Sequence, residues 1–572
     1  MAASSRPGSD VGWTKWQIAI AVGAPIAVAG LAFGAYYLTR SGSPEESSDT
    51  KSGTAGTSGN TKANGEGDAG KNSSVEHTQT PEEQAQAAKL RGNKYFKAGH
   101  YEQAIKLYSQ AIEICPKDNV KDLSTFYQNK AAANEQMKNH AQVVADCNNA
   151  LELNSRYVKA LFRRAKAFEM MNERMKCLED ATAVCLLEGF SHQQGMILAD
   201  KMLKEIGKEK AAEKYTERVP SLPSGQFIRS YFSSFSNDGI SNTSDEDYCS
   251  PDDFASAGYA KAKHCFKEGN YETIIDACTE EIDSEGSKLP EALLMRATFY
   301  LLKGQGTLAR PDLDKVITLP EADKKLKANA LIKRGSMHMQ EGQQMEAMTD
   351  FGQAATIDPD NADVYHHRGQ LLLLLERVDK AVEDFQKCSS LSPDFALAHA
   401  QHCYANYRLS VMVQSPMQMQ AAVKALEECC KKFSQCAEAY ALYAQSLNDQ
   451  GQFQQADENF LKAVALEPDN PTAYVHRGLL YLAWKKDPEQ AIRMIQKALE
   501  IDSRCDFAYE TLGTIEVQRG NMAAAQEYFN QAIELTRTEM EMAHLFSLSV
   551  AAQAQSNVTT KFGIVPPSAL RP

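Results

Sequence analysis

A 34-residue spacing that recurs along most of the chain constrains the fold more than any other feature of the sequence. In its first clear copy, positions 8, 11, 20, 24, 27 and 32 are occupied by Gly92, Tyr95, Ala104, Tyr108, Ala111 and Pro116. Small residues at positions 8, 20 and 27 allow two helices to approach closely, and bulky residues fill the space between them. Each copy therefore predicts a helix–turn–helix unit.

The pattern recurs downstream with high fidelity. The matching residues are Gly335, Ala347, Phe351, Ala354 and Pro359, then Gly369, Ala381, Phe385 and Pro393, then Ala444, Ala456, Phe460, Ala463 and Pro468, then Gly513, Ala525, Phe529 and Ala532. Weaker copies begin near residues 124, 158, 255, 290, 396 and 471, which gives eleven in total. This is the pattern of the tetratricopeptide repeat. It predicts an all-α superhelical solenoid of about eleven repeats in two blocks.

The N-terminal segment predicts a membrane anchor. Residues 17–38 hold 22 positions without a charge, enough to cross a hydrocarbon layer of about 30 Å as a helix. The stretch is longer than the apolar region of a secretory signal and follows a polar leader at residues 1–16, so we interpret it as a retained transmembrane helix. Residues 39–81 are rich in Ser and Gly and predict a disordered tether.

The repeats are interrupted once. An extra helix is expected at residues 186–216, and residues 217–254, with their Pro, Gly, Ser and acidic content, predict a loop or linker. The sequence thus predicts a three-repeat block at 82–216 and an eight-repeat block at 255–572. The latter includes a C-terminal capping helix that covers the last apolar face.

Composition excludes several classes of function. The net charge is −13 and no long basic run occurs, so nucleic acid is not an expected partner. Thirteen cysteines without a CxxC motif indicate buried thiols in a reducing compartment, although the vicinal Cys429–Cys430 pair leaves a redox role open. No phosphate-binding loop, metal-ligand spacing or nucleophile motif is found, so we expect neither an enzyme nor a cofactor nor a metal site.

Five polar residues on the first helices of the first three repeats predict a carboxylate-binding site. Such helices line the concave surface of a solenoid. Three cations and two amides there suit a pair of carboxylates, each charge-assisted hydrogen bond contributing about 1.5–3 kcal/mol. The five residues are Lys89, Asn93, Asn129, Lys159 and Arg163.

This set resembles the dicarboxylate clamp of co-chaperone tetratricopeptide domains, which bind the C-terminal Glu-Glu-Val-Asp of the 70- and 90-kilodalton heat-shock chaperones. The whole chain from residue 82 resembles the family of 70-kilodalton import receptors of the mitochondrial outer-membrane translocase, in its vertebrate form. The segments that carry this resemblance are STFYQNKAAA, VKALFRRAKA, VYHHRGQL, CAEAYALYAQ and CDFAYETLGTIEVQRGNM.

The resemblance implies a receptor that takes hydrophobic preproteins with internal targeting signals, such as metabolite carriers, from cytosolic chaperones. It implies a single-pass protein of the mitochondrial outer membrane, with its N-terminus in the intermembrane space, its bulk in the cytosol, and other translocase subunits as partners. A homodimer is compatible with the sequence. Charges flanking the anchor do not decide its orientation.

The second block would then hold the preprotein groove, lined by positions 2, 5, 6 and 9 of the first helices. These positions nominate Asp363, His366, Gln370, Glu438, Gln445, His476 and Glu510. Glu438 is favoured because an acidic side chain can meet the basic face of an amphipathic signal helix. The alternatives are that these are ordinary polar residues of helix surfaces, and that the chain is an ER-anchored co-chaperone or assembly scaffold.

Overall fold

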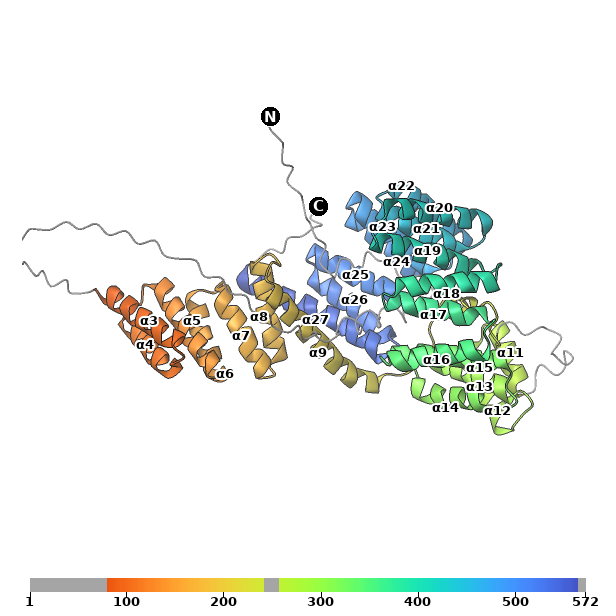
Figure 1. Cartoon of the computed structure of the whole chain (residues 1–572), viewed down its shortest axis with the longest axis horizontal. Helices are drawn as coiled ribbons and strands as arrows, with labels where there is room; N and C mark the ends of the chain where they lie inside the picture. Colours follow the sequence, from red (N-terminus) through yellow and green to blue (C-terminus); the bar gives the residue numbers. More distant parts are fainter. Residues whose placement is uncertain (1–79, 241–256, 564–572) are drawn as a thin grey trace, which may run out of the picture. The chain divides into compact units, whose positions relative to one another are not determined.

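The computed structural model describes residues 80–240 and 257–563, and within these ranges all regular structure is helical. The predicted leader, the anchor at 17–38 and the tether up to residue 79 lie outside the described residues. No helix in the described ranges combines the length and apolar character needed to cross a bilayer. The predicted all-α repeat fold is confirmed, with eleven helix pairs among these residues (Figure 1).

The described residues form two compact units. The N-terminal unit comprises residues 80–202 and 557–563, and the C-terminal unit comprises residues 203–240 and 257–556. The N-terminal unit contains three helix pairs: α3 (Pro81–Lys97) with α4 (Tyr101–Ile114), α5 (Val120–Gln136) with α6 (His140–Leu153), and α7 (Val158–Met170) with α8 (Arg174–Leu187). The long helix α9 (Gln193–Glu217) follows.

The C-terminal unit contains eight further pairs. They are α11 (Gly258–Lys267) with α12 (Ile274–Asp283), α13 (Leu289–Leu302) with α14 (Gly306–Thr318), α15 (Lys324–Gln340) with α16 (Gln344–Ile357), α17 (Ala362–Leu374) with α18 (Val378–Leu391), α19 (Ala396–Met412) with α20 (Pro416–Lys432), α21 (Ala437–Asp449) with α22 (Phe453–Leu466), α23 (Pro471–Lys485) with α24 (Pro488–Ile501), and α25 (Asp506–Arg519) with α26 (Met522–Leu535). The short helices α10 (Gly225–Ser233) and η3 (Tyr271–Thr273) and the terminal helix α27 (Glu539–Phe562) complete the list.

Within a repeat, the two helices touch where a small residue faces an aromatic ring. A Cβ atom added to Gly92 would lie 2.7 Å from Cε1 of Tyr108, and one added to Gly513 would lie 2.7 Å from Cε1 of Phe529. Because carbon atoms do not approach so closely, only glycine permits this crossing. Tyr95 does not share this role, since its side chain is 43% exposed, and its predicted packing function is wrong.

In several repeats, an ion pair lies next to this contact between the two helices. The residue before the small position is an arginine that binds both carboxylate oxygens of an aspartate sixteen residues later, with N–O distances of 2.6–2.9 Å. The pairs are Arg164–Asp180, Arg296–Asp312, Arg334–Asp350 and Arg368–Asp384. Each aspartate is buried, so its charge depends on the arginine for compensation.

The segment predicted as a loop at 217–254 is helical in part. Residues 225–233 form α10, with the Ser224 side chain accepting a hydrogen bond from the Phe227 backbone at its start. Ile228 and Phe232 of α10 are buried with residues of α11 to α13. The prediction of a loop is wrong here. The Pro, Gly and Ser content indicated a loop, whereas the apolar residues of the segment form a buried helix face.

A buried ion pair fixes the end of this segment. Nζ of Lys333, on α15, lies 2.7 Å from Oδ2 of Asp238, and both side chains are inaccessible to solvent. Asn329 and the backbone N–H of Ile240 also donate to Asp238. Burial alone would raise the pKa of Asp238, but the Lys333 ammonium and these donors hold it below its usual value. Burial lowers the pKa of Lys333.

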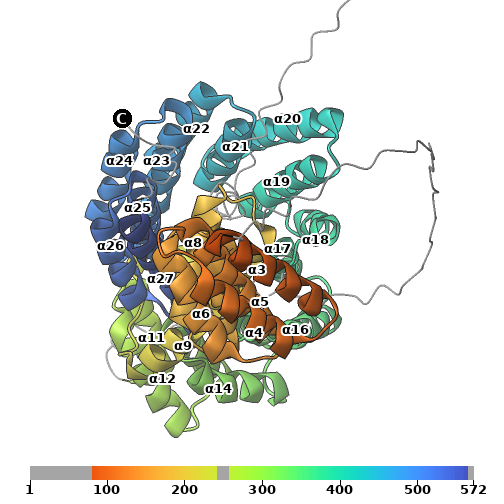
Figure 2. The ribbon, with the colours of Figure 1, turned by 90° about the vertical axis from the view of Figure 1, so that its left-hand side faces the viewer.

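The turn within the second repeat of the C-terminal unit, between α13 and α14, meets the turn between α26 and α27. Tyr215 Oη donates to the carbonyl oxygens of both Gly304 and Arg537, at 2.9 and 3.1 Å. Arg218 donates to the carbonyls of Lys303, Gly304 and Thr536. A Cβ at Gly304, whose φ is +69°, would clash with the Arg537 carbonyl. The helices of this unit accordingly follow one another around a closed curve (Figure 2).

The terminal helix α27 contributes to both units. Its Met542 and Leu545 pack with Ala211 of α9 in the C-terminal unit. Its Val558 and Phe562 are buried with residues of α6 to α8 in the N-terminal unit. The chain end predicted to cap the second block is thus also part of the core of the first.

We predict that Lys333→Met lowers the free energy of unfolding by about 3–5 kcal/mol, because it leaves the Asp238 carboxylate buried without a counter-charge. Urea unfolding followed by circular dichroism measures this change. Adding Asp238→Leu should recover most of the loss, since it removes the orphaned charge. The control is Lys325→Met on the exposed side of α15. An equal effect of the two single substitutions would contradict the assigned role.

Candidate peptide-binding surfaces

The five predicted clamp residues lie on the first helices of the three N-terminal repeats. Lys89 and Asn93 are on α3, Asn129 is on α5, and Lys159 and Arg163 are on α7. Lys159 is exposed and the other four are half-buried. The side chains are thus held on three helices of equivalent position, with enough exposure to meet a ligand.

Two of these residues already have partners. Oδ1 of Asn93 accepts a hydrogen bond of 2.7 Å from Tyr108 Oη. Nε of Arg163 lies 2.7 Å from Oε2 of Glu135, and its Nη1 reaches the Gln128 carbonyl on α5. Both side chains of the Arg163–Glu135 pair are partly exposed, so the pair is weak and exchangeable. Arg163 is therefore oriented across α5, where an incoming carboxylate would compete with Glu135.

The neighbouring Arg164 has a different role. Arg164 binds both carboxylate oxygens of the buried Asp180 at 2.7 Å and Oδ1 of Asn148 at 2.7 Å. It is thus a structural residue of the third repeat. The sequence signal for this role is the Arg-to-Asp spacing of sixteen residues, which recurs in the C-terminal unit.

The predicted preprotein groove is largely buried on the α17 side. Asp363 is 1% exposed, and its carboxylate accepts hydrogen bonds from the backbone and hydroxyl of Ser236 and from the backbone of Asn237. The ring of Phe235 lies 4.1 Å from that of His367, centroid to centroid. Residues 235–237 thus cover the start of α17.

A buried polar network continues from this point. Nε2 of Gln370 lies 3.1 Å from Nε2 of His366 and donates to Oε1 of Gln401, at 3.1 Å. His366 is fully buried against Phe395 and Phe385, and burial, together with neighbouring His367, lowers its pKa well below the usual value. Both histidines are therefore neutral at pH 7, which makes this surface a hydrogen-bonding rather than a cationic one.

The middle of the groove lies on α21. Glu438 is half-buried near its N-terminus. Gln445, two turns further on, is 7% exposed, and neither polar atom of its side chain has a hydrogen-bond partner among the described residues. A buried amide normally has partners. Gln445 is thus equipped to bind a polar group that reaches the inner face of this helix.

The last two predicted residues are on α23 and α25. His476 stacks on Phe460 and contacts Phe507, and burial lowers its pKa to about 4. Glu510 is half-buried, and its Oε1 lies 3.1 Å from Nε2 of His544 on α27. The seven residues lie on the first helices α17, α21, α23 and α25, and only Glu438 and Glu510 among them are half-buried rather than buried.

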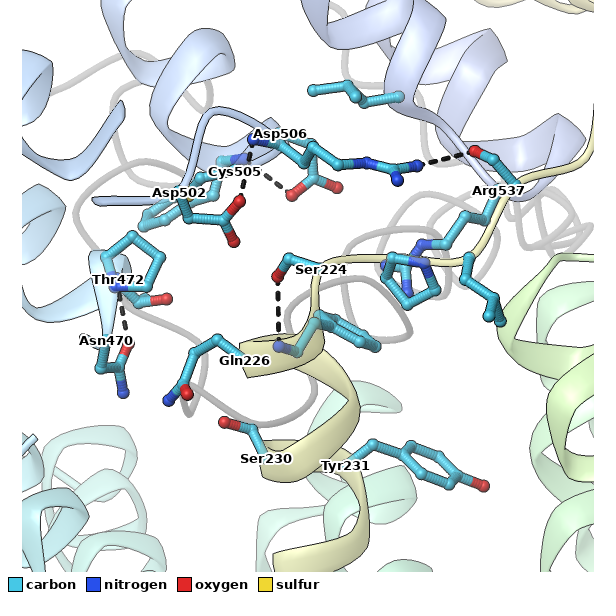
Figure 3. A pocket seen from close by; sticks show the side chains of 18 residues that line it. Ser224, Gln226, Ser230, Tyr231, Asn470, Thr472, Asp502, Cys505, Asp506 and Arg537 are labelled. Atoms are coloured by element: carbon cyan, nitrogen blue, oxygen red, sulfur yellow. Dashed lines mark hydrogen bonds between the residues drawn. The ribbon is translucent and has the colours of Figure 1, made fainter. Parts of the chain in front are cut away.

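A cavity of about 80 Å³ lies between the 221–231 segment and the start of helices α23 and α25 (Figure 3). Asn470 caps the start of α23, whereas Cys505, the N-cap residue of α25, makes no side-chain cap hydrogen bond. Asn470 accepts from the Thr472 backbone, Asp502 from Arg504 and Asp506 from Phe507. Burial raises the pKa of Asp506 to about 6. The cavity is lined by two carboxylates, of Asp502 and Asp506, and by two guanidinium groups, of Arg504 and Arg537, so its charges are mixed.

Comparison with known proteins agrees with the repeat pattern. A family model described as "Tetratricopeptide repeat" matches residues 85–118, and another with the same description matches 362–395 and 508–539. A model described as "TPR repeat" matches residues 335–376 and 444–483.

The mitochondrial import receptor subunit TOM70 of Homo sapiens is 53% identical to this chain over 576 residues, which cover 97% of this chain and 94% of the human protein. The chain belongs to the TOM70 family of mitochondrial import receptor subunits. The TOM70 of Rattus norvegicus is 52% identical over 99% of this chain and 95% of its own length. A TOM70 of Saccharomyces cerevisiae is 24% identical over 83% of this chain and 80% of its own length. The crystal structure of yeast Tom70 aligns with a TM-score of 0.47 and 23% identity over 84% of this chain and 98% of that one.

The family confirms the resemblance deduced from the sequence. TOM70 proteins are import receptors rather than enzymes, and tetratricopeptide repeats and mitochondrial import are properties of the group. The chain is therefore a mitochondrial import receptor.

Proposed function

We propose that this receptor has two peptide-binding surfaces, one for a chaperone and one for the preprotein that the chaperone carries. Docking of the chaperone on the N-terminal unit would raise the local concentration of its cargo at the C-terminal unit without any covalent step. The preprotein would then pass to the translocase pore. The observation that carries this proposal is the placement of five clamp-type residues on α3, α5 and α7, apart from a second polar inner face on α17 to α25.

The chaperone site uses Lys89, Asn93, Asn129, Lys159 and Arg163 to bind the acidic C-terminus of a 70- or 90-kilodalton heat-shock chaperone. Arg163 is the key residue, because its contacts with α5 aim the guanidinium at the helix that carries Asn129. The bound carboxylate would replace Glu135 as its partner. This exchange costs little, since the existing pair is solvent-accessible.

Arg163→Ala should weaken binding of a peptide ending in Glu-Glu-Val-Asp by at least about tenfold, which corresponds to the loss of about 1.5–3 kcal/mol for a charge-assisted hydrogen bond. Fluorescence anisotropy with the labelled peptide measures the affinity. Lys166→Ala removes the same charge from an exposed position of α7 and is the matched control. Unchanged affinity of the Arg163 variant would refute the clamp.

The preprotein surface uses Asp363, His366, Gln370, Glu438, Gln445, His476 and Glu510. Most of these side chains are buried, so a ligand that reaches Gln445 or His366 must displace atoms that now cover them. Glu438 is half-buried, with its Oε1 atom inaccessible to solvent, so it needs less uncovering than these residues. We therefore expect the basic face of an amphipathic targeting helix to contact Glu438 first.

Glu438→Gln should reduce binding of a basic amphipathic carrier-type peptide several-fold and should flatten the salt dependence of binding, since one charge pair is lost. Isothermal titration at two salt concentrations measures both effects. Glu428→Gln, on the exposed side of α20, changes the same charge away from the inner face. If both variants lose the same affinity, general electrostatic attraction explains the binding and Glu438 has no specific role.

The receptor is proposed to be anchored in the mitochondrial outer membrane by residues 17–38, with the repeats in the cytosol. The support is the uncharged stretch of 22 residues together with membership of an import-receptor family. External protease added to intact mitochondria should remove residues 80–563. Protection of these residues until the outer membrane is opened would reverse the proposed orientation.

A further inference from the structure

Residues 234–240 lie against three first helices of the C-terminal unit. They contact α17 through Asp363, α15 through Lys333 and α11 through Lys263, and all three partner side chains are buried. First helices form the surface on which a solenoid of this kind binds peptides. The segment thus occupies a surface that the repeats offer to a ligand.

The carboxylate of Asp238 is the central contact of this segment. Its Oδ2 atom lies 2.7 Å from Nζ of Lys333 and 3.0 Å from Nδ2 of Asn329. The side chains of Asp238 and Lys333 are inaccessible to solvent. Charge-assisted hydrogen bonds of this kind are stronger than neutral ones. An ammonium and an amide therefore hold the segment as they would hold an acidic peptide.

This pair of donors occupies the same repeat positions as a pair of the predicted clamp. Counted from Gly335 at position 8, Asn329 and Lys333 are at positions 2 and 6. Lys159 and Arg163 are at positions 2 and 6 of the third repeat of the N-terminal unit. Because equivalent positions of first helices face equivalent surfaces, each pair faces the inner surface of its own unit.

An aromatic ring is the second anchor of the segment. Phe235 is 6% exposed and belongs to the same core cluster as Ile332 and Val364. The centroid of its ring lies 4.1 Å from that of His367 and 4.6 Å from Nζ of Lys333. The ring and the carboxylate are three residues apart in the sequence, so the groove fits a peptide with the pattern Phe-x-x-Asp.

Hydrogen bonds to the main chain complete the site. The backbone N–H groups of Ser236 and Asn237 donate to the two carboxylate oxygens of Asp363, at 2.6 and 3.0 Å. Lys263 donates to the carbonyl oxygen of Ile240. In peptide recognition, main-chain hydrogen bonds contribute affinity and side-chain pockets contribute specificity. Both kinds of contact are present here.

We propose that residues 234–240 are an internal ligand of this groove, and that a separate peptide with the pattern Phe-x-x-Asp can take their place. While the segment is bound, it closes the inner face of α11, α15 and the start of α17 to other peptides. A ligand that approaches Asp363 must compete with the segment for its carboxylate. The site is apart from the clamp, and it does not depend on the chaperone or preprotein binding proposed above.

Hydrogen exchange of the wild-type chain, followed by mass spectrometry, tests whether the segment leaves the groove as a unit. We expect the amides of residues 234–240 to exchange together and at least about tenfold faster than the central amides of α15 and α17, because a ligand can dissociate while its groove stays folded. Exchange of the segment at the rate of α15 and α17 would show that it opens only when they unfold. It would then be an integral part of the core, which would overturn the proposal.

Binding of a separate peptide tests the groove itself. The probe is the labelled peptide SSFSNDGI, residues 233–240, with its C-terminus amidated so that it offers no terminal carboxylate to the clamp. The full chain with Phe235→Ser and Asp238→Ser should bind one peptide per chain. Its affinity should be at least about tenfold higher than that of the wild-type chain, whose groove holds the internal ligand at a high effective concentration. Fluorescence anisotropy measures both affinities, and circular dichroism checks that the helicity is unchanged.

Matched changes assign the binding to this groove. A peptide carrying Asp238→Asn should bind at least about tenfold more weakly, since it loses the charge-assisted hydrogen bonds. Adding Lys333→Met to the doubly substituted chain should have the same effect, whereas Lys325→Met on the exposed side of α15 should have none. Equal affinity of the doubly substituted and wild-type chains, or of the two peptides, would overturn the proposal. The exchange measurement decides alone if the doubly substituted chain does not fold.

Discussion

The rest of this receptor depends on the close approach of the two helices of a repeat, made by two residues that lie sixteen positions apart in the sequence. A glycine under an aromatic ring, as at Gly92 and Tyr108, sets the separation of the helices. One residue earlier along both helices, an arginine such as Arg368 binds a buried aspartate such as Asp384 with both carboxylate oxygens. The ring contact fixes the distance, and the bidentate pair fixes the rotation of one helix about the other. Because several repeats share these contacts, their first helices succeed one another and present equivalent positions on one surface.

The inner surface formed by the first helices differs in exposure between the two units. In the N-terminal unit, the inner residues Lys89, Asn129 and Arg163 are accessible enough to bind a ligand directly. In the C-terminal unit, the turn at Gly304 meets the turn at Arg537, and residues 235–240 cover part of α15 and α17. Of the seven predicted groove residues of the second unit, five are buried and two, Glu438 and Glu510, are half-buried.

Much of the fold was predictable because its determinants recur at one period. Small and bulky residues at fixed positions identify the helix pairs, and the structure and the family relationship confirm them. The Arg–Asp pairs were not predicted, although their spacing is visible in the sequence, because the small and bulky positions alone define the helix pairs. Arg477 shows the limit of such a rule: sixteen residues later stands Arg493, and Arg477 binds Asp457 of the preceding repeat instead.

The segment before α11 was less predictable for a physical reason. Its apolar residues Phe227, Ile228 and Phe232 do not follow the repeat, and they are buried only because α11 to α15 supply a surface for them. The same holds for Asp363 and His366, whose positions in the repeat indicate an inner face but not what covers it. The clamp residues remain a prediction about binding, since their placement was deducible from the repeat but their ligand is not part of the chain.

The measurement that tests the two-surface account most directly is photo-cross-linking of a basic amphipathic carrier-type peptide to the whole chain, with the sites mapped by mass spectrometry. The account predicts cross-links on the inner positions of α17, α21 and α23, centred on Glu438, and their persistence when an excess of Glu-Glu-Val-Asp peptide occupies the first unit. Cross-links confined to residues 82–216, or their loss on addition of the acidic peptide, would show that a single surface serves both ligands and would contradict it.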